Sequence, residues 1–369
     1  MTLQLCAFIT AHSSCHNLSL NPDYLEDFSR AESLSILSKC YFSGKTLDCL
    51  HICNGIVLPP KVTNTSQIVC YGGVLDENRK YVDMSAQTAE NYYGQKLQQL
   101  VLGAYDISEY NVAQSDETVI YMNCMFTSHW GHFLIDIVGR LWYALQNTDY
   151  RIVYTCFSME QNPISGRYLE LLELMGIPEA RLLGTDKVTQ FRKIIIPEVS
   201  ILSGRYFTQE YRDLFSRAVA NSGAVLAKSD KIYCSRRHFE AAQHKEDGEQ
   251  YIEKVFTDNG FRAVYMEQMT VEEQIRILNS ASEIAMFNGT LAHNLVFVRN
   301  NAKVTIIDKT HITNVYQPVV NQIPDAEICV VDAYVAPLPV GYGLGPFIVR
   351  LTKEFLKYCE DRGVNYRHL

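Results

Sequence analysis

The chain has 369 residues, which is long for a single hydrophobic core and predicts two domains. Hydrophobic residues make up 47% of the chain and charged residues 20%, a composition typical of a globular protein. The formal net charge of -8 disfavours nucleic acid as a partner, because no basic excess is available to neutralise phosphates.

Eleven cysteines are scattered along the chain without regular spacing, which is typical of reduced thiols in a cytoplasmic protein. The segment Cys49-Leu50-His51-Ile52-Cys53 is similar to half a zinc site, but no second pair of ligands follows at zinc-finger spacing. We therefore interpret these cysteines as small buried hydrophobic residues. No apolar run approaches the roughly 18 residues of a membrane span, and the first nine residues lack the basic flank of a signal peptide.

The first third of the chain shows no regular alternation of elements. Within it, strands are predicted at 47–58, 67–75 and 118–122 from their apolar and β-branched runs, with a break at Pro59-Pro60. The stretch 127–143 then holds both tryptophans of the protein. We predict a helix here, in which His132, Asp136 and Arg140 recur every four residues and share one face.

Strand and helix alternate through the rest of the chain, which predicts parallel α/β layers and, from residue 231, a doubly wound sheet. The predicted strands are 151–157, 180–183, 193–197, 231–235, 261–265, 283–287 and 304–308. The predicted helices are 166–175, 211–227, 249–259, 270–279, 291–298 and 347–362, and a loop rich in proline and glycine spans 337–345.

Burying titratable groups costs free energy, so their presence on the otherwise apolar helix predicted at 127–143 needs a physical reason. One interpretation is that Asp136 orients His132 and raises its basicity, which leaves the other ring nitrogen as a general base. The alternative is a buried hydrogen bond that only positions helices, or an Arg140 that neutralises Asp136. Metal ligation by His129, His132 and Asp136 matches no standard helix spacing except that of His132 with Asp136.

Polar and charged side chains also gather at the carboxyl ends of the strands after residue 230, where open α/β sheets bind ligands. They are Arg236, Arg237, Asn288, Gly289, Thr290, His293, Asn294 and Asp308. A guanidinium can hold a phosphate through two N–H groups, and a glycine before a helix lets an anion approach the backbone. Each has an ordinary alternative: solvated arginines, a simple Asn-Gly turn, a structural histidine. Their convergence predicts one anion site.

Several common catalytic motifs are absent from the sequence. There is no Gly-x-Gly-x-x-Gly fingerprint and no Walker loop, which disfavours dinucleotide oxidoreduction and P-loop hydrolysis. A Gly-x-Ser-x-Gly elbow is also missing, which disfavours a serine hydrolase. No Asp-x-Asp pair occurs, so cationic side chains and helix dipoles are the expected partners of a pyrophosphate.

Two blocks of the sequence resemble glycosyltransferase family 61. The first is His132-x-x-x-Asp136-x-x-x-Arg140-Leu141, similar to the family's His-x-x-x-Asp followed by Pro-Arg-Leu. The second runs over 231–308 and includes Ile232-Tyr233-Cys234-Ser235-Arg236-Arg237, Met269-Thr270-Val271-Glu272-Glu273-Gln274 and Asn288-Gly289-Thr290-Leu291-Ala292-His293-Asn294. The chain departs from the family at Gly139 in place of Pro, at 288–292 in place of His-Gly-Ala-Gly-Leu, and at Asp308 in place of Glu.

The resemblance implies a GT-B-like α/β fold with two Rossmann-like domains facing a cleft. Residues 1–225 would form the N-terminal, acceptor-side domain and 226–340 the nucleotide-sugar-binding domain. Residues 341–369 would form a terminal helix that crosses back to pack on the first domain.

The resemblance also implies inverting, metal-independent transfer of a hexose or pentose from a nucleoside diphosphate sugar, expected to be UDP-linked. The acceptor would be a hydroxyl of a glycan or lipid-linked glycan in capsule or lipopolysaccharide synthesis. The expected place is the bacterial cytoplasm or the inner face of the membrane, with peripheral membrane association through the acceptor. Beyond the nucleotide sugar as co-substrate, no cofactor and no metal is expected.

Roles for individual residues follow from the same resemblance. The catalytic pair would be His132 and Asp136, with His129, Arg140 and Asp308 in support. The donor would be bound by Arg236, Arg237, Glu273, Gln274, Asn288, Gly289, Thr290, His293 and Asn294, with Glu273 meeting the ribose. The alternatives are a non-catalytic glycan-binding or scaffold subunit, and a hydrolase that uses the His132/Asp136 pair.

Overall fold

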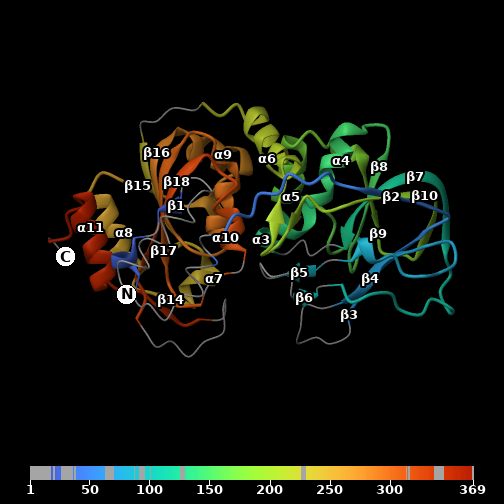
Figure 1. Ribbon diagram of the computed structural model, residues 1–369, viewed down its shortest axis with the longest axis horizontal. Coiled ribbons are helices and arrows are strands. Elements are labelled where there is room, and N and C mark those ends of the chain that lie inside the picture. Colours follow the sequence, from blue (N-terminus) through green and yellow to red (C-terminus); the bar gives the residue numbers. More distant parts are fainter. Residues whose placement is uncertain are drawn as a thin grey trace. The chain divides into compact units, whose positions relative to one another are not determined.

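A computed structural model describes most of the chain. The described residues are 18–19, 21–25, 36, 39–62, 70–86, 88–90, 96–99, 101–124, 129–225, 230–312, 314, 316–335 and 345–367. The chain divides into two compact units (Figure 1): unit 1 comprises residues 1–40 and 219–369, and unit 2 comprises residues 41–218. This division differs from the predicted one, because the first 40 residues and the C-terminal segment both belong to unit 1.

Unit 1 is built on a parallel sheet with the strand order β1-β18-β17-β16-β13-β15. The strands are β1 (Leu18–Ser19), β13 (Asp230–Cys234), β15 (Arg262–Val264), β16 (Ala281–Phe287), β17 (Ala302–Asp308) and β18 (Ala326–Asp332). From β13 onward this sheet has the flavodoxin-like order 2-1-3-4-5, in which the chain reverses direction across the sheet between β13 and β16. The predicted parallel α/β layering is confirmed, although β18 was not predicted.

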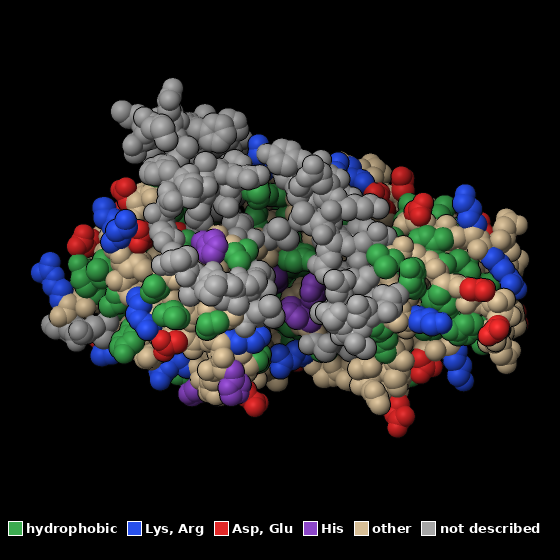
Figure 2. Space-filling view, turned by 90° about the horizontal axis from the view of Figure 1, so that it is seen from below, with side chains coloured by type: hydrophobic (Ala, Val, Ile, Leu, Met, Phe, Trp, Pro, Cys, Tyr) green, Lys and Arg blue, Asp and Glu red, His purple; other side chains and the backbone are tan. Residues whose placement is uncertain are grey.

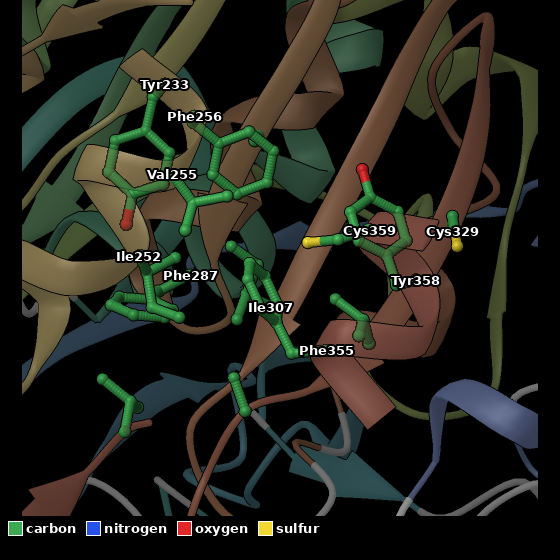
Figure 3. Packing of buried hydrophobic residues seen from close by; sticks show 14 of the residues in the cluster. Tyr233, Ile252, Val255, Phe256, Phe287, Ile307, Cys329, Phe355, Tyr358 and Cys359 are labelled. Atoms are coloured by element: carbon green, nitrogen blue, oxygen red, sulfur yellow. The ribbon is translucent and has the colours of Figure 1, made fainter. Parts of the chain in front are cut away.

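Helices cover both faces of this sheet, with α8 and α11 on one face and α9 and α10 on the other (Figure 1). Figure 3 shows the core on the α8 side, where Phe256 and Phe355 pack with Phe287 and Ile307 of the sheet. The helices of unit 1 are η1 (Pro22–Tyr24), α7 (Glu240–Gln243), α8 (Glu249–Asp258), η7 (Met266–Gln268), α9 (Val271–Ser280), η8 (Thr290–Phe297), α10 (Gln317–Val320) and α11 (Lys353–Arg362). A short parallel ribbon joins β14 (Glu246–Asp247) to β19 (Phe347–Ile348).

The terminal helix α11 packs on unit 1, whereas we expected it to cross back to the N-terminal domain. The Tyr358 hydroxyl lies 2.8 Å from that of Thr305 on β17. The ring of Tyr24, from the N-terminal segment, stands edge-on to Tyr358 at 5.5 Å, and its hydroxyl donates to Asp361 at 3.0 Å. The apolar face of α11 is therefore buried against β17, β18 and residues 22–24.

Unit 2 is built on a mixed sheet with the order β4-β3-β10-β7-β8-β9, and β2 also pairs with β10. The strands β10, β7, β8 and β9 are parallel, whereas β2, β3 and β4 are added antiparallel. The strands are β2 (Cys49–Cys53), β3 (Ile56–Val62), β4 (Cys70–Leu75), β7 (Ala113–Cys124), β8 (Arg151–Thr155), β9 (Leu182–Thr185) and β10 (Thr189–Pro197). Shorter strands are β5 (Thr88–Glu90), β6 (Lys96–Gln99), β11 (Ile201–Leu202) and β12 (Tyr206–Phe207).

Most helices of unit 2 connect successive parallel strands along the chain. They are η3 (Asp83–Ser85), α3 (Trp130–His132), η4 (Phe133–Ile137), η5 (Val138–Arg140), α4 (Leu141–Gln146), α5 (Arg167–Leu174), η6 (Glu179–Arg181) and α6 (Gln209–Asn221). The predicted single helix at 127–143 is thus a succession of short α, π and 3-10 turns; residues 127 and 128 lie outside the described residues.

Two sequence expectations for unit 2 were wrong. The predicted strand at 47–58 is two strands, because Asn54 takes a left-handed conformation with φ 51° and turns the chain. The predicted break at Pro59-Pro60 lies inside β3, where the pairing register with β4 shifts between Leu58 and Lys61. Prolines are tolerated there because an irregular ladder does not need their missing N–H groups.

The cysteines also differ in part from their interpretation. Cys40 is disulfide-bonded, whereas we expected reduced thiols throughout. The described free cysteines are Cys49, Cys53, Cys70, Cys156, Cys234, Cys329 and Cys359. Five of these are buried as expected, but Cys53 is exposed and Cys49 is half-buried, because β2 presents them at its surface.

Charged side chains of both signs are interspersed on the described part of the face in Figure 2. Within the described residues, none of the helices combines the length and the apolar character needed to cross a membrane.

Replacing Phe355 by alanine should destabilise unit 1 by about 3–5 kcal/mol, because the ring is fully buried between α11 and the sheet. Both tryptophans, Trp130 and Trp142, belong to unit 2, so their fluorescence monitors that unit while circular dichroism monitors both. We expect a lower unfolding midpoint by circular dichroism. The control Lys353→Ala, at a side chain that is 86% exposed, should keep the wild-type midpoint. An unchanged midpoint in Phe355→Ala would contradict the docking of α11.

Candidate active site

Two cationic side chains and a glycine lie close together in unit 1, at the point where the order of the parallel strands reverses. Arg236 follows β13 and Gly289 follows β16, the two strands between which the order reverses. A Cβ atom placed on Gly289 would lie 3.7 Å from Arg236 Nη1 and 3.8 Å from Nζ of Lys309, which follows β17. Gly289 has φ 129°, a conformation that other residues rarely adopt. An anion can therefore meet both cations and the Gly289 backbone here.

Glu246 holds the two cations together. Its Oε1 lies 3.1 Å from Arg236 Nη2 and also accepts a hydrogen bond from Lys309 Nζ. The Glu246 side chain is only 4% exposed, yet its Oε2 has no hydrogen-bond partner, and neither has the buried Nε of Arg236. Because buried unpaired polar atoms are costly, this cluster has hydrogen-bonding capacity left for a ligand.

Burial shifts the pKa values of two neighbours in this cluster. It lowers the pKa of Lys309 to about 8, and the nearby Arg236 lowers it further while Glu246 opposes the shift. Burial likewise raises the pKa of Glu249 to about 7, against the hydrogen bond that the Arg236 backbone N–H donates to it at 2.9 Å. The Tyr233 hydroxyl donates to the same Glu249 oxygen at 3.1 Å. Two of the charges around the cluster therefore change near neutral pH.

Asn288 and Asp308 join this site from the ends of β16 and β17. Asn288 Nδ2 donates to Asp308 Oδ1 at 2.5 Å, so Asp308 orients the amide. The amide oxygen of Asn288 is buried without a hydrogen-bond partner. Gly289 is the N-cap of the 3-10 helix η8, and no side chain caps its first N–H groups. The residues after the C-terminal end of β16 therefore provide both a side-chain amide and backbone N–H groups that can bind a ligand.

Other predicted donor-binding residues are engaged elsewhere. Arg237 is 46% exposed and pairs with Glu253 on α8 at 3.0 Å. The Glu273 carboxylate accepts from the Thr270 N–H at 2.8 Å and completes the capping box of α9, so it is occupied by the helix end rather than turned to a ribose. Gln274 is buried and donates to the Met266 carbonyl at 2.9 Å.

The predicted histidine and asparagine of η8 lie in the interior of unit 1. Asn294 Nδ2 donates to Gln274 Oε1 at 3.0 Å, which ties η8 to α9. His293 is 4% exposed, with its Nε2 3.4 Å from Asn314 Nδ2 and its ring edge-on to Tyr316. The described contacts of His293 and Asn294 are therefore structural. Thr290 is the first residue of η8 and directly follows Gly289.

In unit 2, His132 and Asp136 form the predicted pair. His132 Nδ1 lies 2.6 Å from Asp136 Oδ2, and Ser203 Oγ donates to Asp136 Oδ1 at 2.8 Å. The Asp136 side chain is 3% exposed and that of His132 is 21% exposed. Both carboxylate oxygens are thus engaged inside the unit, while the imidazole reaches the surface. Ser203 was missed, because nothing in its sequence context marks a serine 67 residues away as a partner.

A π turn places Asp136, and side chains from distant segments satisfy its backbone. Asn123 Nδ2 donates to the Asp136 carbonyl at 3.0 Å, and the Tyr211 hydroxyl donates to the Leu134 carbonyl at 2.7 Å. Ser200 donates to the Gly139 carbonyl through both its N–H and its hydroxyl. A Cβ atom on Gly139 would lie 3.2 Å from Ile201 Cγ2, so glycine permits this close approach. π turns are frequent at functional sites.

The described hydrogen bonds of Arg140 are to another segment of unit 2 and not to Asp136. The π and 3-10 turns differ from an α-helix in their number of residues per turn, so the α-helical spacing that predicted a shared face does not apply as far as Arg140. Its Nη2 instead donates to the carbonyls of Met84, at 2.5 Å, and Ala86, at 3.3 Å. Burial lowers the pKa of Arg140, which is 2% exposed. It therefore anchors the η3 segment rather than neutralising Asp136.

His129 acts as the cap of this helical stretch. Its Nδ1 accepts from the His132 N–H at 3.3 Å, and the two rings lie 4.5 Å apart. Desolvation and the neighbouring His132 lower the pKa of His129, while Asp136 opposes them. The described residues include no cluster of three or more His, Cys, Asp or Glu that could hold a metal ion.

Comparison with known proteins relates a large part of the chain to one family. Residues 130–305, which include both the His132/Asp136 pair and the Arg236/Gly289 site, match the family model described as Glycosyltransferase 61. No curated protein matches the chain. Among solved structures, the chain is similar to the dodecameric iron-containing heptosyltransferase TibC in complex with ADP-D-beta-D-heptose. That similarity has a TM-score of 0.31 and 10% identity, over 81% of this chain and 83% of that chain.

Glu249→Gln should flatten the pH dependence of stability of unit 1. A carboxyl whose pKa is about 7 in the fold stabilises it below pH 4.5, and this contribution is lost as the pH rises through 7. The loss is on the order of 3 kcal/mol. An amide does not titrate and can still accept from Arg236 and Tyr233, so the variant should be more stable than the wild type above pH 7.

Thermal unfolding followed by circular dichroism between pH 5 and pH 8 measures this difference. The control Glu240→Gln, at an exposed residue of α7, should keep the wild-type pH profile. A Glu249→Gln protein with an unchanged slope would show that Glu249 is ionised throughout this range.

Proposed function

We propose a donor, a base and a stereochemical course for this protein, which belongs to glycosyltransferase family 61 and is a glycosyltransferase. In this proposal a sugar passes from a nucleoside diphosphate sugar, UDP-linked in our expectation, to a glycan hydroxyl with inversion at the anomeric carbon. The observation that carries the proposal is the convergence of Arg236, Lys309 and the Gly289 backbone at the strand reversal of unit 1. Sites of this kind bind phosphates in open α/β sheets.

The diphosphate of the donor would bind Arg236 and Lys309. It would take the place of Glu246 at these cations, because the phosphate oxygens make the same charge-assisted hydrogen bonds. Asn288 and the N–H groups at the start of η8 would hold the remaining oxygens. Two fixed cations stabilise the negative charge that develops on the leaving diphosphate, so the proposed transfer needs no metal ion.

His132 is the proposed base on the acceptor side. Because Asp136 engages its Nδ1, proton exchange with an acceptor hydroxyl would pass through Nε2. Asp136 accepts from both His132 and Ser203 and is almost fully buried, so it suits a role in orienting the imidazole and stabilising its protonated form. A single displacement by the activated hydroxyl inverts the anomeric carbon.

The proposal includes a GT-B arrangement of the two units around the reacting sugar. It also includes an acceptor of the capsule or lipopolysaccharide type, free or lipid-linked, used in the cytoplasm. Both rest on the resemblance of the sequence to the family.

Release of UDP from UDP-sugars in the presence of glycan acceptors tests the reaction. His132→Ala should lower the rate roughly 10²-fold or more, because a positioned base contributes about 10²–10⁴. Ser203→Ala should lower it less, since Asp136 keeps its bond to His132. The control His51→Ala, at an exposed histidine of β2, should be as active as the wild type. A near-normal rate in His132→Ala would refute the assignment of the base; release of free sugar without transfer would indicate a hydrolase.

Lys309 should make donor binding depend on pH. Because its pKa is about 8, the ammonium is lost above that pH, and the affinity for UDP should fall between pH 7.5 and 9.5. In Lys309→Arg the charge persists, so titration calorimetry should give a flatter profile. Lys309→Met should bind UDP roughly 10- to 100-fold more weakly at pH 7.5, as expected for a charge-assisted bond.

The matched control for these variants is Lys303→Met, at the exposed opposite end of the same strand. It should bind UDP as the wild type does. Equal affinity of Lys309→Met and the wild type would remove Lys309 from the donor site.

A further inference from the structure

A stacked aromatic pair lies beside the Arg236 site of unit 1. The rings of His238 and Tyr265 are 4.0 Å apart with an interplanar angle of 9°. His238 follows β13 and Tyr265 follows β15, so the pair stands at the carboxyl edge of the sheet, as Arg236 and Gly289 do. His238 is exposed, and its Nδ1 lies 3.2 Å from Gln268 Nε2, which fixes the orientation of the ring.

The strand order sets the distance between this pair and the cations. Gly289 follows β16, Arg236 follows β13 and Tyr265 follows β15, and these are three neighbouring strands in that order. Neighbouring strands are spaced about 4.8 Å apart, so the pair lies roughly 10 Å from Gly289 along the edge. A nucleoside attached to a diphosphate at Arg236 would extend over a comparable length.

The exposed surface here has the chemistry that recognises a planar base. One face of the His238 imidazole stacks on Tyr265, and the exposure of the residue leaves ring surface open to a ligand. The next residue, Phe239, is 41% exposed, and the Arg236 guanidinium lies over its ring at 5.6 Å. Aromatic faces bind the π-faces of bases, largely independently of base identity.

A buried acceptor lies next to the stacked pair. Glu267, on η7, has an Oε1 atom that is buried without a hydrogen-bond partner. Glu267 lies on η7 two residues after Tyr265, which is the N-cap of η7, and the next residue, Gln268, contacts His238. A carboxylate oxygen in this position can accept hydrogen bonds from ribose hydroxyls. Glu273, which the family resemblance predicts to meet the ribose, caps α9 instead.

We propose that the ends of β13 and β15 form the nucleoside subsite of the donor. The base stacks on the open face of His238, and Glu267 accepts from the ribose hydroxyls. This inference rests on the proposed function, because it requires the diphosphate to lie between Arg236 and Lys309.

Titration calorimetry with UDP, ADP and inorganic pyrophosphate tests the subsite. His238→Ala should bind UDP and ADP roughly 5- to 100-fold more weakly than the wild type, the effect of losing one base–aromatic stack. It should bind pyrophosphate as the wild type does, because pyrophosphate has no base. His238→Phe keeps a ring and should retain nucleotide affinity. Glu267→Ala should lose affinity for UDP but not for pyrophosphate.

The control His244→Ala, at an exposed histidine of the same unit, should leave all three affinities unchanged. Nucleotide affinity in His238→Ala equal to that of the wild type would overturn the subsite. An equal loss for UDP and pyrophosphate would also overturn it, since the substitution would then act on the Arg236 segment. If the wild-type protein binds UDP and ADP no more tightly than it binds pyrophosphate, only this inference is refuted. If it binds none of the three ligands, the proposed function itself is refuted.

Discussion

The buried carboxylate of Glu246 holds the charged site of unit 1 together. Burying a cation costs several kcal/mol unless it is paired, and here one oxygen compensates both Arg236 and Lys309. Glu246 is held in turn by the pairing of β14 with β19, and the Lys309 ammonium lies 4.6 Å from the centre of the Phe347 ring. The C-terminal segment thus contributes β19 and the Phe347 ring to the surroundings of this charge cluster.

The two key carboxylates differ in what they leave unpaired. Asp136 accepts from His132 and Ser203 and is fixed by both, so it can orient an imidazole but has little freedom to move. Glu246 uses only one of its oxygens, and the other is buried without a partner. A fixed carboxylate suits the control of a base, whereas a partly paired one suits exchange with an incoming anion.

Much of unit 1 was predictable because its strands are short, buried apolar runs bounded by glycine and asparagine. The strand β18 escaped prediction because the helix before it, α10, has only four residues and breaks the regular alternation. In unit 2 the spacing of four residues identified the contact of His132 with Asp136. The same spacing failed for Arg140, because the chain passes from the π turn into the 3-10 turn Val138–Arg140, and the side chains that hold the π turn, Asn123 and Tyr211, are remote in the sequence.

The sequence by itself determined the parallel α/β layering, the resemblance to glycosyltransferase family 61 and the His132/Asp136 pair. These depend on local spacing and on motifs that the chain carries whatever its tertiary arrangement. Only the tertiary structure decided which polar residues meet: Lys309 and Glu246 are 63 residues apart and join Arg236, while Arg237 and Glu273 turn to structural partners. The reason is that strand order brings strand ends together, and periodicity within a strand contains no information about that order.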